Sequence, residues 1–379
     1  MDDDDNEKNK VITDGEAAGI LNTLYGSSSQ IDNSTRQKHD PTKLEVKGLA
    51  IKQVHFTKEE CDQIIKNIQH QNRMAYDTFI VTPEFRLLYL QAFSPYPPKP
   101  SASWLYLYCT LGIGSIIHPV SSLNQLPERV QALYLSCTSL VGQTIIESSP
   151  TSAVALSAYS HFCMLIGDFL SQGKFGKLAL SIFFALGYQH DKTFSNMNEE
   201  ERESRVRIFW HVYTVGFFHS AFFTDTRDIL DIRLITTPYP VKRTKSTRFL
   251  DQDDSFTRDN DYKYQNIKLK LINAWAKYYD NDLIKYHKIS IDLFNEIKSI
   301  VEYQGVSNQD RPALEMYSIV TQSIIIHMMA CAHKKQNNIN IEALKIFVHT
   351  AYEYIDEIYD YTMKKIYLGA SWYVIHHVF

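Results

Sequence analysis

Apolar residues recur along this chain mainly at the three- and four-residue spacing of amphipathic helices, and strand-like alternation is rare. The spacing predicts a helix that follows Thr57 and further helices at about 82–93, 103–117, 127–145, 152–171, 178–189, 198–223, 264–303, 311–334 and 340–364. The pattern therefore predicts an all-α fold, an irregular multi-helix domain with no significant sheet.

Polar segments that lack this spacing are expected to mark the ends of the helices and of the helical region. Residues 1–45, rich in Asp, Asn, Ser and Gly, are expected to form a disordered acidic and polar tail, and residues 46–379 a helical region. The Gly-containing stretch "SQGKFGK", 171–177, predicts a break between two helices. The longest irregular region, 224–264, is expected to be a surface loop or a seam between two helical halves. Because the chain ends inside an apolar pattern, "LGASWYVIHHVF", we expect it to be incomplete at the C-terminus.

Composition narrows the class of protein. Of the 379 residues, 44% are hydrophobic and 13% aromatic, which is ample material for a core. The net charge of −4 gives no basic footprint for nucleic acid. Five widely spaced cysteines exclude a short-spaced zinc knuckle and indicate buried thiols in a reducing compartment. The uncharged stretch 100–127 is read as a buried helix, because its apolar run is shorter than a membrane span.

The helix expected at 198–223 passes abruptly from charged to aromatic residues. Asn198 can cap it, with Glu201 three residues later in the arrangement of a capping box. Glu201 and Arg205 are spaced to form an ion pair. Beyond Val206 the aromatic residues follow a single apolar stripe, which predicts one face packed on the core.

The segments "LALSIFFALGYQHD", "EEERESRVRIFWHVYTVGFFHSAFF" and "ITTPYP" resemble the middle homology region of fungal-specific zinc-cluster transcription factors. In that family an Ala-rich helix ends in Leu-Gly-Leu-His. An acidic cap, arginines, a Trp-Trp pair, a Tyr, a Ser and a loop ending in Leu-Pro follow. The family-motif positions in this chain are Gly187, His190, Arg205, Arg207, Trp210, Tyr213, Ser220 and Pro240.

The resemblance implies a regulatory module that is not an enzyme, acts in the nucleus and senses a ligand or a partner. It implies contacts with other transcription-regulatory proteins, a homodimer, a small hydrophobic ligand and no membrane. Family members carry zinc in a cluster that is lacking here, so this chain is expected to hold no cofactor. DNA would be contacted only through a missing segment or a partner. The family's Asp-Arg and Gly-Arg-Pro positions are occupied by Gly216-Phe217 and Thr224-Asp225-Thr226, so those family pairings are in doubt.

Other candidate chemistry in the sequence is weaker. His211 and His219 are about 80° apart on a helix, and the pairs His327–His333 and His376–His377 are also poorly spaced for one metal. The acidic run "DQDDSFTRDNDY", 251–262, reads as a solvated loop rather than a Mg²⁺ site. The basic run "VKRTKSTR", 241–248, reads as a solvated loop, with a nuclear localisation signal as the alternative. No catalytic motif and no metal site is expected.

Three functions remain open from the sequence. The first is the regulatory module, with an apolar pocket among aromatic helices. The second is an all-α enzyme acting on a lipid or isoprenoid, which would need two or more convergent acids in a cavity. The third is an interaction scaffold that does not bind DNA. The candidate pocket residues, each also a candidate for the core, are Phe162, Phe183, Trp210, Phe217 and Phe222.

Overall fold

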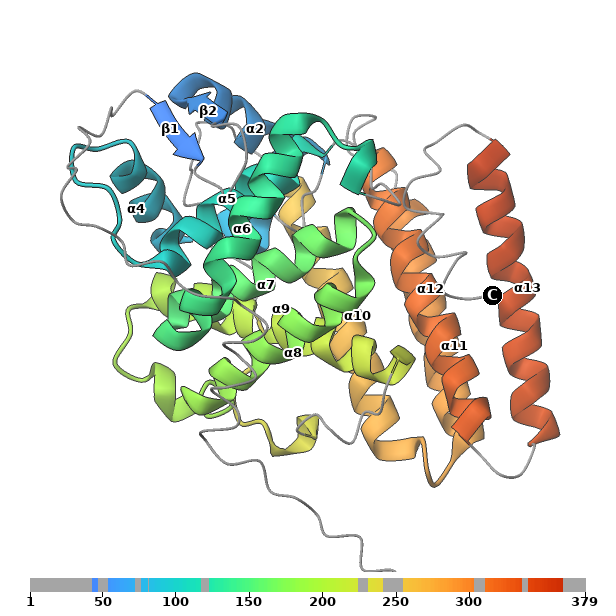
Figure 1. The fold of residues 1–379 in the computed structure, drawn as a ribbon. Coiled ribbons are helices and arrows are strands. Elements are labelled where there is room, and N and C mark those ends of the chain that lie inside the picture. The colour runs from blue at the N-terminus through green and yellow to red at the C-terminus, as the bar shows by residue number, and fades with distance from the viewer. Residues whose placement is uncertain are drawn as a thin grey trace, which may run out of the picture. The chain divides into compact units, whose positions relative to one another are not determined.

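The computed structural model of the chain is built almost wholly of α-helices (Figure 1), so the all-α prediction is confirmed. It describes residues 43–46, 54–71, 76–80, 82–116, 123–223, 231–240, 255–302, 311–335 and 340–363. The helices are α2 (Lys58–Gln71), α4 (Pro83–Ala92), α5 (Ser101–Ser115), α6 (Glu128–Glu147), α7 (Pro150–Leu165), α8 (Phe169–Ala185), α9 (Glu199–Phe223), α10 (Ser255–Tyr278), α11 (Leu283–Glu302), α12 (Arg311–Lys335) and α13 (Ile341–Met363).

Short elements fill several of the connections. Strands β1 (Lys43–Val46) and β2 (Val54–Thr57) form a two-stranded antiparallel pair, the one sheet among the described residues. A π-helical turn, η1, spans Tyr76–Ile80, and 3₁₀ turns span Leu123–Gln125 (η2), Asp191–Phe194 (η3) and Ile232–Leu234 (η5). Residues 43–45 thus lie in a strand, although the sequence placed them in the disordered tail. The rest of that tail lies outside the described residues.

The N-terminal caps of α2 and α9 are formed by the residues that the sequence predicted. Thr57 and Glu60 form the expected capping box of α2: the Glu60 amide donates to Thr57 Oγ1 at 3.2 Å, and the Thr57 amide donates to Glu60 Oε2 at 2.8 Å. In α9 the Glu201 amide donates to Asn198 Oδ1 at 2.9 Å. Such caps satisfy backbone groups that no helical partner can reach.

One expected connection is misplaced. The stretch 171–177 does not break a helix, because α8 runs through it. The break falls earlier, at Gly167, whose φ of +76° suits glycine, and Asp168 then caps α8 by accepting from the Ser171 amide at 3.1 Å. Gly173 serves close packing instead: a Cβ there would lie 1.7 Å from Nε2 of His219 on α9.

The region expected as one helix, 264–303, is two. Helix α10 ends at Tyr278 and α11 begins at Leu283, where Asp282 caps it by accepting from the Lys285 amide at 3.0 Å. Helix α10 begins at Ser255, so residues 255–262 are helical rather than the solvated loop that was expected. The side chains of that acidic stretch lie outside the described part of the structure.

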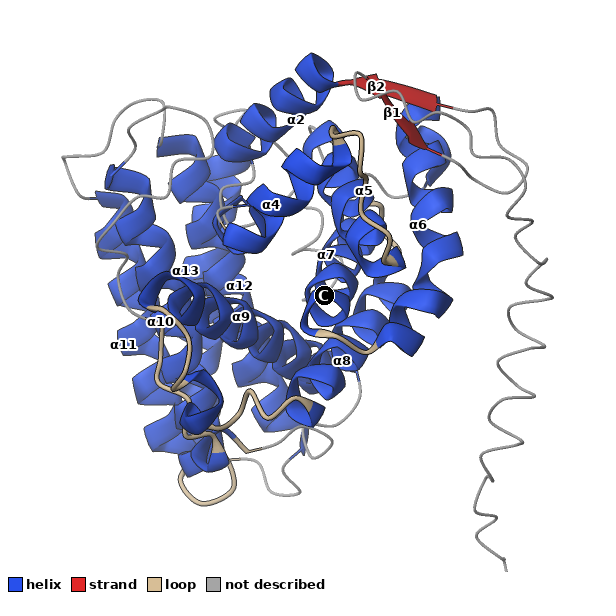
Figure 2. Ribbon diagram, turned by 90° about the vertical axis from the view of Figure 1, so that its left-hand side faces the viewer, coloured by secondary structure: helices blue, strands red, loops and turns tan. Residues whose placement is uncertain are grey.

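Helix α9 joins two groups of helices. It contacts α8 on one side and α10 and α12 on the other, and it also touches α4 and η1. Figure 2 shows α5–α8 and α10–α13 to either side of it. The single apolar stripe predicted for α9 is therefore wrong: from Ile208 to Thr214 every residue is buried. A helix enclosed by neighbours on all sides has no solvent face.

Residues 40–379 form one compact unit by their contacts. The segment 231–240 is tied to the chain after α8, since the Thr236 amide donates to the Gln189 carbonyl at 2.9 Å. The interpretation of 224–264 as a seam stays a prediction. All five cysteines are buried and free, as expected. Among the described residues, no helix is long and apolar enough to cross a membrane.

Candidate functional site

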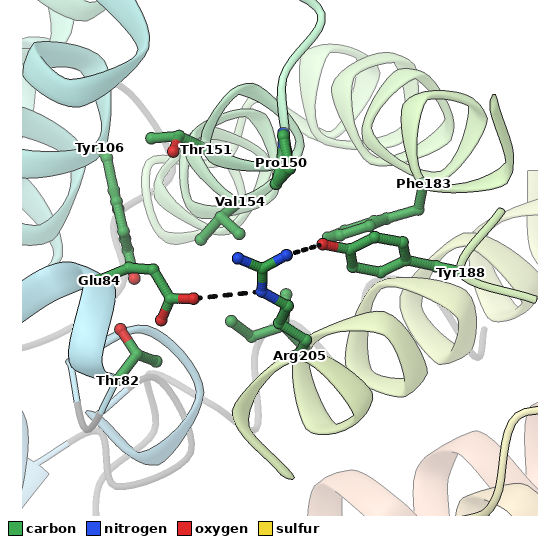
Figure 3. Close-up of a pocket in the computed structure, with 10 residues that line it drawn as sticks. Thr82, Glu84, Tyr106, Pro150, Thr151, Val154, Phe183, Tyr188 and Arg205 are labelled. Carbon is green, nitrogen blue, oxygen red and sulfur yellow. Dashed lines mark hydrogen bonds and ion pairs between the residues drawn. The ribbon is translucent and has the colours of Figure 1, made fainter. Parts of the chain in front are cut away.

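A small pocket lies where the first turns of α4 and α7 meet α5, α8 and α9 (Figure 3). Its volume is about 130 Å³. This is well below the ~300 Å³ at which pockets for drug-sized ligands begin. The lining residues are Thr82, Glu84, Tyr106, Pro150, Thr151, Val154, Phe183, Tyr188, Arg205 and Ile208.

The guanidinium of Arg205 is the charged centre of this pocket. Its Nη2 lies 2.7 Å from Oε1 of Glu201, one turn earlier on α9, so the expected ion pair is confirmed. Its Nε lies 3.4 Å from Oε1 of Glu84 on α4, and its Nη1 donates to the Tyr188 hydroxyl at 3.1 Å. The arginine thereby connects α9 to the start of α4 and to the loop after α8.

Electrostatics keep this arginine charged. Burial alone would lower the pKa of Arg205, but Tyr188, Glu84 and Glu201 more than offset that and raise it. Burial raises the pKa of the Tyr188 phenol, which therefore stays protonated. One arginine and two carboxylates give the group a net charge of −1. This sign disfavours an anionic ligand.

Glu84 is positioned by the way α4 begins. Thr82 is the N-cap and its Oγ1 accepts from the Phe85 amide at 3.0 Å, while Pro83 occupies the first helical position. This places Glu84 in the first turn, where a carboxylate is favoured by the helix dipole. Its Oε2 is buried and receives no hydrogen bond from the described residues. A buried carboxylate oxygen without a donor is costly, so this atom is a ready acceptor for a ligand.

The wall opposite Glu84 is apolar. Helix α7 begins with Ser149 and Ser152 in a reciprocal capping box and with Pro150 at its first position. Val154, one turn later, faces the pocket together with Phe183. The arrangement suits a small molecule with a hydroxyl or ammonium donor for Glu84 and a short apolar group for this wall.

Of the five aromatic residues predicted for a pocket, Phe183 lines it. Phe162 is fully buried beside Tyr134, and Trp210 and Phe217 are buried among other aromatic rings, so these three belong to the core. The side chain of Phe222 lies outside the described part of the structure.

Of the family-motif residues, Arg205 lines the pocket, and Gly187 directly precedes Tyr188, which also lines it. Gly187 has φ +78° at the end of α8, and the amide of His190 donates to its carbonyl at 2.9 Å, which forms the turn that places Tyr188. His190 itself is exposed. Trp210 donates from Nε1 to the Pro238 carbonyl at 2.7 Å and packs edge-on against Tyr239, 5.0 Å between ring centroids.

The remaining motif residues lie away from the cavity. Tyr213 and Ser220 are fully buried on α9, and Arg207 is half-buried there. Pro240 is buried at the end of the loop. At one of the positions where the chain departs from the family, Phe217 stacks on Tyr213. Residues 224–226 lie outside the described range.

The histidines form no metal site among the described residues, where no cluster of three or more ligating side chains occurs. His211 packs edge-on against Phe79, 5.6 Å between ring centroids, and burial lowers its pKa to about 3. His333 packs edge-on against His287 of α11, 4.8 Å between ring centroids. The pair His376–His377 and the basic run 241–248 lie outside the described residues.

The sequence predicted Glu201 as a partner of Arg205 but did not predict Glu84 or Tyr188. Glu84 is 121 residues away, and no local pattern links the two. Thr82-Pro83-Glu84 is a recognisable helix start, so a signal for the position of Glu84 was present. What was lacking was any sign that this turn would pack against α9.

Comparisons with protein-family models, with curated proteins and with solved structures find no match for this chain.

Proposed function

We propose that this chain is a regulatory module of a fungal transcription regulator that senses a small molecule in the pocket around Arg205. The observation that carries the proposal is the convergence of Tyr188 and Arg205, both in the stretch that resembles the family, on one cavity beside Glu84. In this proposal the module is not an enzyme, acts in the nucleus and contacts other transcription-regulatory proteins. DNA contact comes from another segment or from a partner.

The pocket offers a physical route from ligand to response. Its walls come from helices that are distant in sequence, and the Arg205–Glu84 contact is the polar link between α9 and α4 there. A ligand that donates to Glu84 Oε2 adds a second link and stabilises the arrangement in which α4 and α7 close on α9. A ligand shifts an equilibrium only as far as it prefers one arrangement, so the effect is set by this added contact.

The rival enzyme function draws less support from the geometry. An isoprenoid-type site needs several carboxylates that face one cavity, whereas the residues lining this pocket include one, Glu84. A cavity of about 130 Å³ is also too small for a lipid or isoprenoid chain. A scaffold that binds no ligand is the remaining alternative, and the binding experiment below distinguishes it.

Calorimetric titration tests the proposal with three probes of one shape: isobutylamine, isobutanol and isobutyrate. We expect the amine to bind most tightly and the carboxylate least, because Glu84 Oε2 requires a donor. Glu84→Gln should weaken amine binding by about tenfold or more, the value of a charge-assisted hydrogen bond. Val154→Phe, which fills the cavity, should abolish binding.

Ile146→Phe is the matched control, because Ile146 lies at the exposed end of α6, 75% accessible, and does not line the pocket. It should leave the titration unchanged. No binding of any probe, or tightest binding of isobutyrate, would contradict the proposed pocket chemistry.

A further inference from the structure

Helix α13 has two apolar faces. Its inner face packs on α11 and α12 (Figure 1). On that face Ala343, Thr350 and Tyr354 are almost fully buried, and the Tyr354 hydroxyl donates to the Ile319 carbonyl at 3.4 Å. The helix is thus packed against its neighbours through its inner face.

The outer face carries a continuous stripe of exposed large apolar side chains. At 100° per residue the six positions fall within an arc of about 80° and extend over about 27 Å. Tyr352, near the middle, is 66% exposed. Scattered surface apolar residues need no explanation, but a contiguous stripe of this kind marks an interaction surface. Its members, hereafter the α13 stripe, are Ile341, Leu344, Val348, Tyr352, Ile355 and Tyr359.

The spacing of the α13 stripe is nearly symmetric about Thr350. Ile341 and Tyr359 each lie nine positions from it, and Val348 and Tyr352 each lie two positions from it. Leu344 lies six positions before it and Ile355 five positions after it. A patch that reads almost the same in both directions can meet a copy of itself across a two-fold axis, which requires self-complementarity.

Two exposed charges beside the stripe fit the same arrangement. Lys345 lies five positions before Thr350 and Asp356 six positions after it, and both are exposed. At 100° per residue they lie on the same flank of the stripe, about 20° apart. When two such helices pair in antiparallel orientation across Thr350, Lys345 of each comes opposite Asp356 of the other. In a parallel two-fold pair the two copies of this flank would lie on opposite sides of the interface, and Lys345 would not meet Asp356 of the other copy.

We infer that the α13 stripe binds a second copy of this chain, with the two α13 helices antiparallel and centred on Thr350. Six apolar side chains from each copy close the interface, and two symmetry-related Lys345–Asp356 contacts fix its orientation. The inference is independent of the pocket around Arg205, since no residue is shared between the two surfaces.

Sedimentation equilibrium of the full chain over a range of concentrations tests the inference. A reversible monomer–dimer equilibrium is expected. Tyr352→Glu places a charge at the centre of the interface and should abolish the dimer, while circular dichroism confirms that the helices remain. Leu90→Glu changes an equally exposed apolar residue on α4, 57% accessible, and should leave the dimer intact.

Charge exchange tests the orientation. Lys345→Glu alone and Asp356→Lys alone should each weaken the dimer, by roughly threefold to tenfold in Kd, because each creates two repulsive contacts. A mixture of the two variants should form a mixed dimer about as tight as the original, since both contacts then join opposite charges.

Three outcomes would overturn the inference. The first is a monomer at every concentration. This result would also be expected if another segment of the same chain covered the α13 stripe. The second is a dimer that is insensitive to Tyr352→Glu. The third is a mixture of charge variants no tighter than either variant alone.

Discussion

Arg205 Nε lies 3.4 Å from Glu84 Oε1, so that one half-buried ion pair joins α9 to the first turn of α4 across 121 residues of sequence. The same guanidinium also contacts Glu201 and Tyr188. One side chain thus carries the polar contacts at the point where several helices meet beside a cavity.

Replacing this arginine should destabilise the fold measurably. Arg205→Gln leaves two carboxylates without their cation and the Tyr188 hydroxyl without its donor. The side chain is 23% exposed, which reduces the effect relative to a fully buried pair. We expect a loss of about 1–2 kcal/mol in the free energy of unfolding, measured by denaturant unfolding.

Arg202 provides the control on the same helix. It pairs with Asp191 at 2.9 Å, but both side chains are well exposed. Arg202→Gln should therefore cost at most about 0.5 kcal/mol. Equal losses from the two substitutions would show that Arg205 is an ordinary surface charge.

The two glycines Gly173 and Gly142 should respond to alanine in opposite directions. Both lie inside helices, where alanine is favoured over glycine by about 0.5–1 kcal/mol. At Gly142 nothing lies within 4 Å of the new Cβ, so Gly142→Ala should stabilise the chain by that amount. At Gly173 the new Cβ would meet the His219 ring, so Gly173→Ala should destabilise it by about 1–2 kcal/mol.

Thermal unfolding of both variants measures the difference. If Gly173→Ala also stabilised the protein, the close packing of α8 against α9 at this position would be wrong.

Stability should fall as the solution becomes mildly acidic. Burial lowers the pKa of His161 to about 4, and burial lowers the pKa values of His211 and His287 to about 3. Between these values and the ordinary 6.5 the unfolded chain binds more protons than the native one, so the free energy of unfolding decreases as pH falls. Each histidine contributes about 1.4 kcal/mol per pH unit.

Guanidinium unfolding at about pH 7.5 and about pH 5.5 measures this dependence. His287 is fully buried and neither ring nitrogen has a hydrogen-bond partner among the described residues. His287→Leu should therefore remove one histidine's share of the pH dependence. Equal stability at both pH values would contradict the burial of these rings.

Local signals predicted much of the fold and little of the pocket. Caps such as Thr57 with Glu60 depend on residues three apart, and the sequence displays them directly. The break between two helices was predicted at the wrong glycine, because a glycine that ends a helix and a glycine that allows close packing look alike in a sequence. Gly167 ends a helix through its positive φ, whereas Gly173 admits a neighbouring helix. Only the packing of α8 against α9 separates these roles.

The aromatic residues show the same distinction. Phe183 and Phe162 are both buried aromatic residues in neighbouring helices, and nothing in the sequence indicates which of them lines a cavity. A pocket is a place where packing is incomplete, and that depends on side chains from distant segments. Arg205 was singled out by its place in a motif, but its partner Glu84 depends on long-range packing that no local pattern encodes.

The most direct test of the central proposal is transcription from a reporter gene, driven by this chain fused to an unrelated DNA-binding domain. Val154→Phe should abolish the change in reporter output that accompanies the amine probe, whereas Ile146→Phe should preserve it, with both fusions present at equal levels. An output that responds equally with the cavity filled, or that does not respond at all in the unaltered fusion, would contradict a ligand-sensing role for the pocket around Arg205.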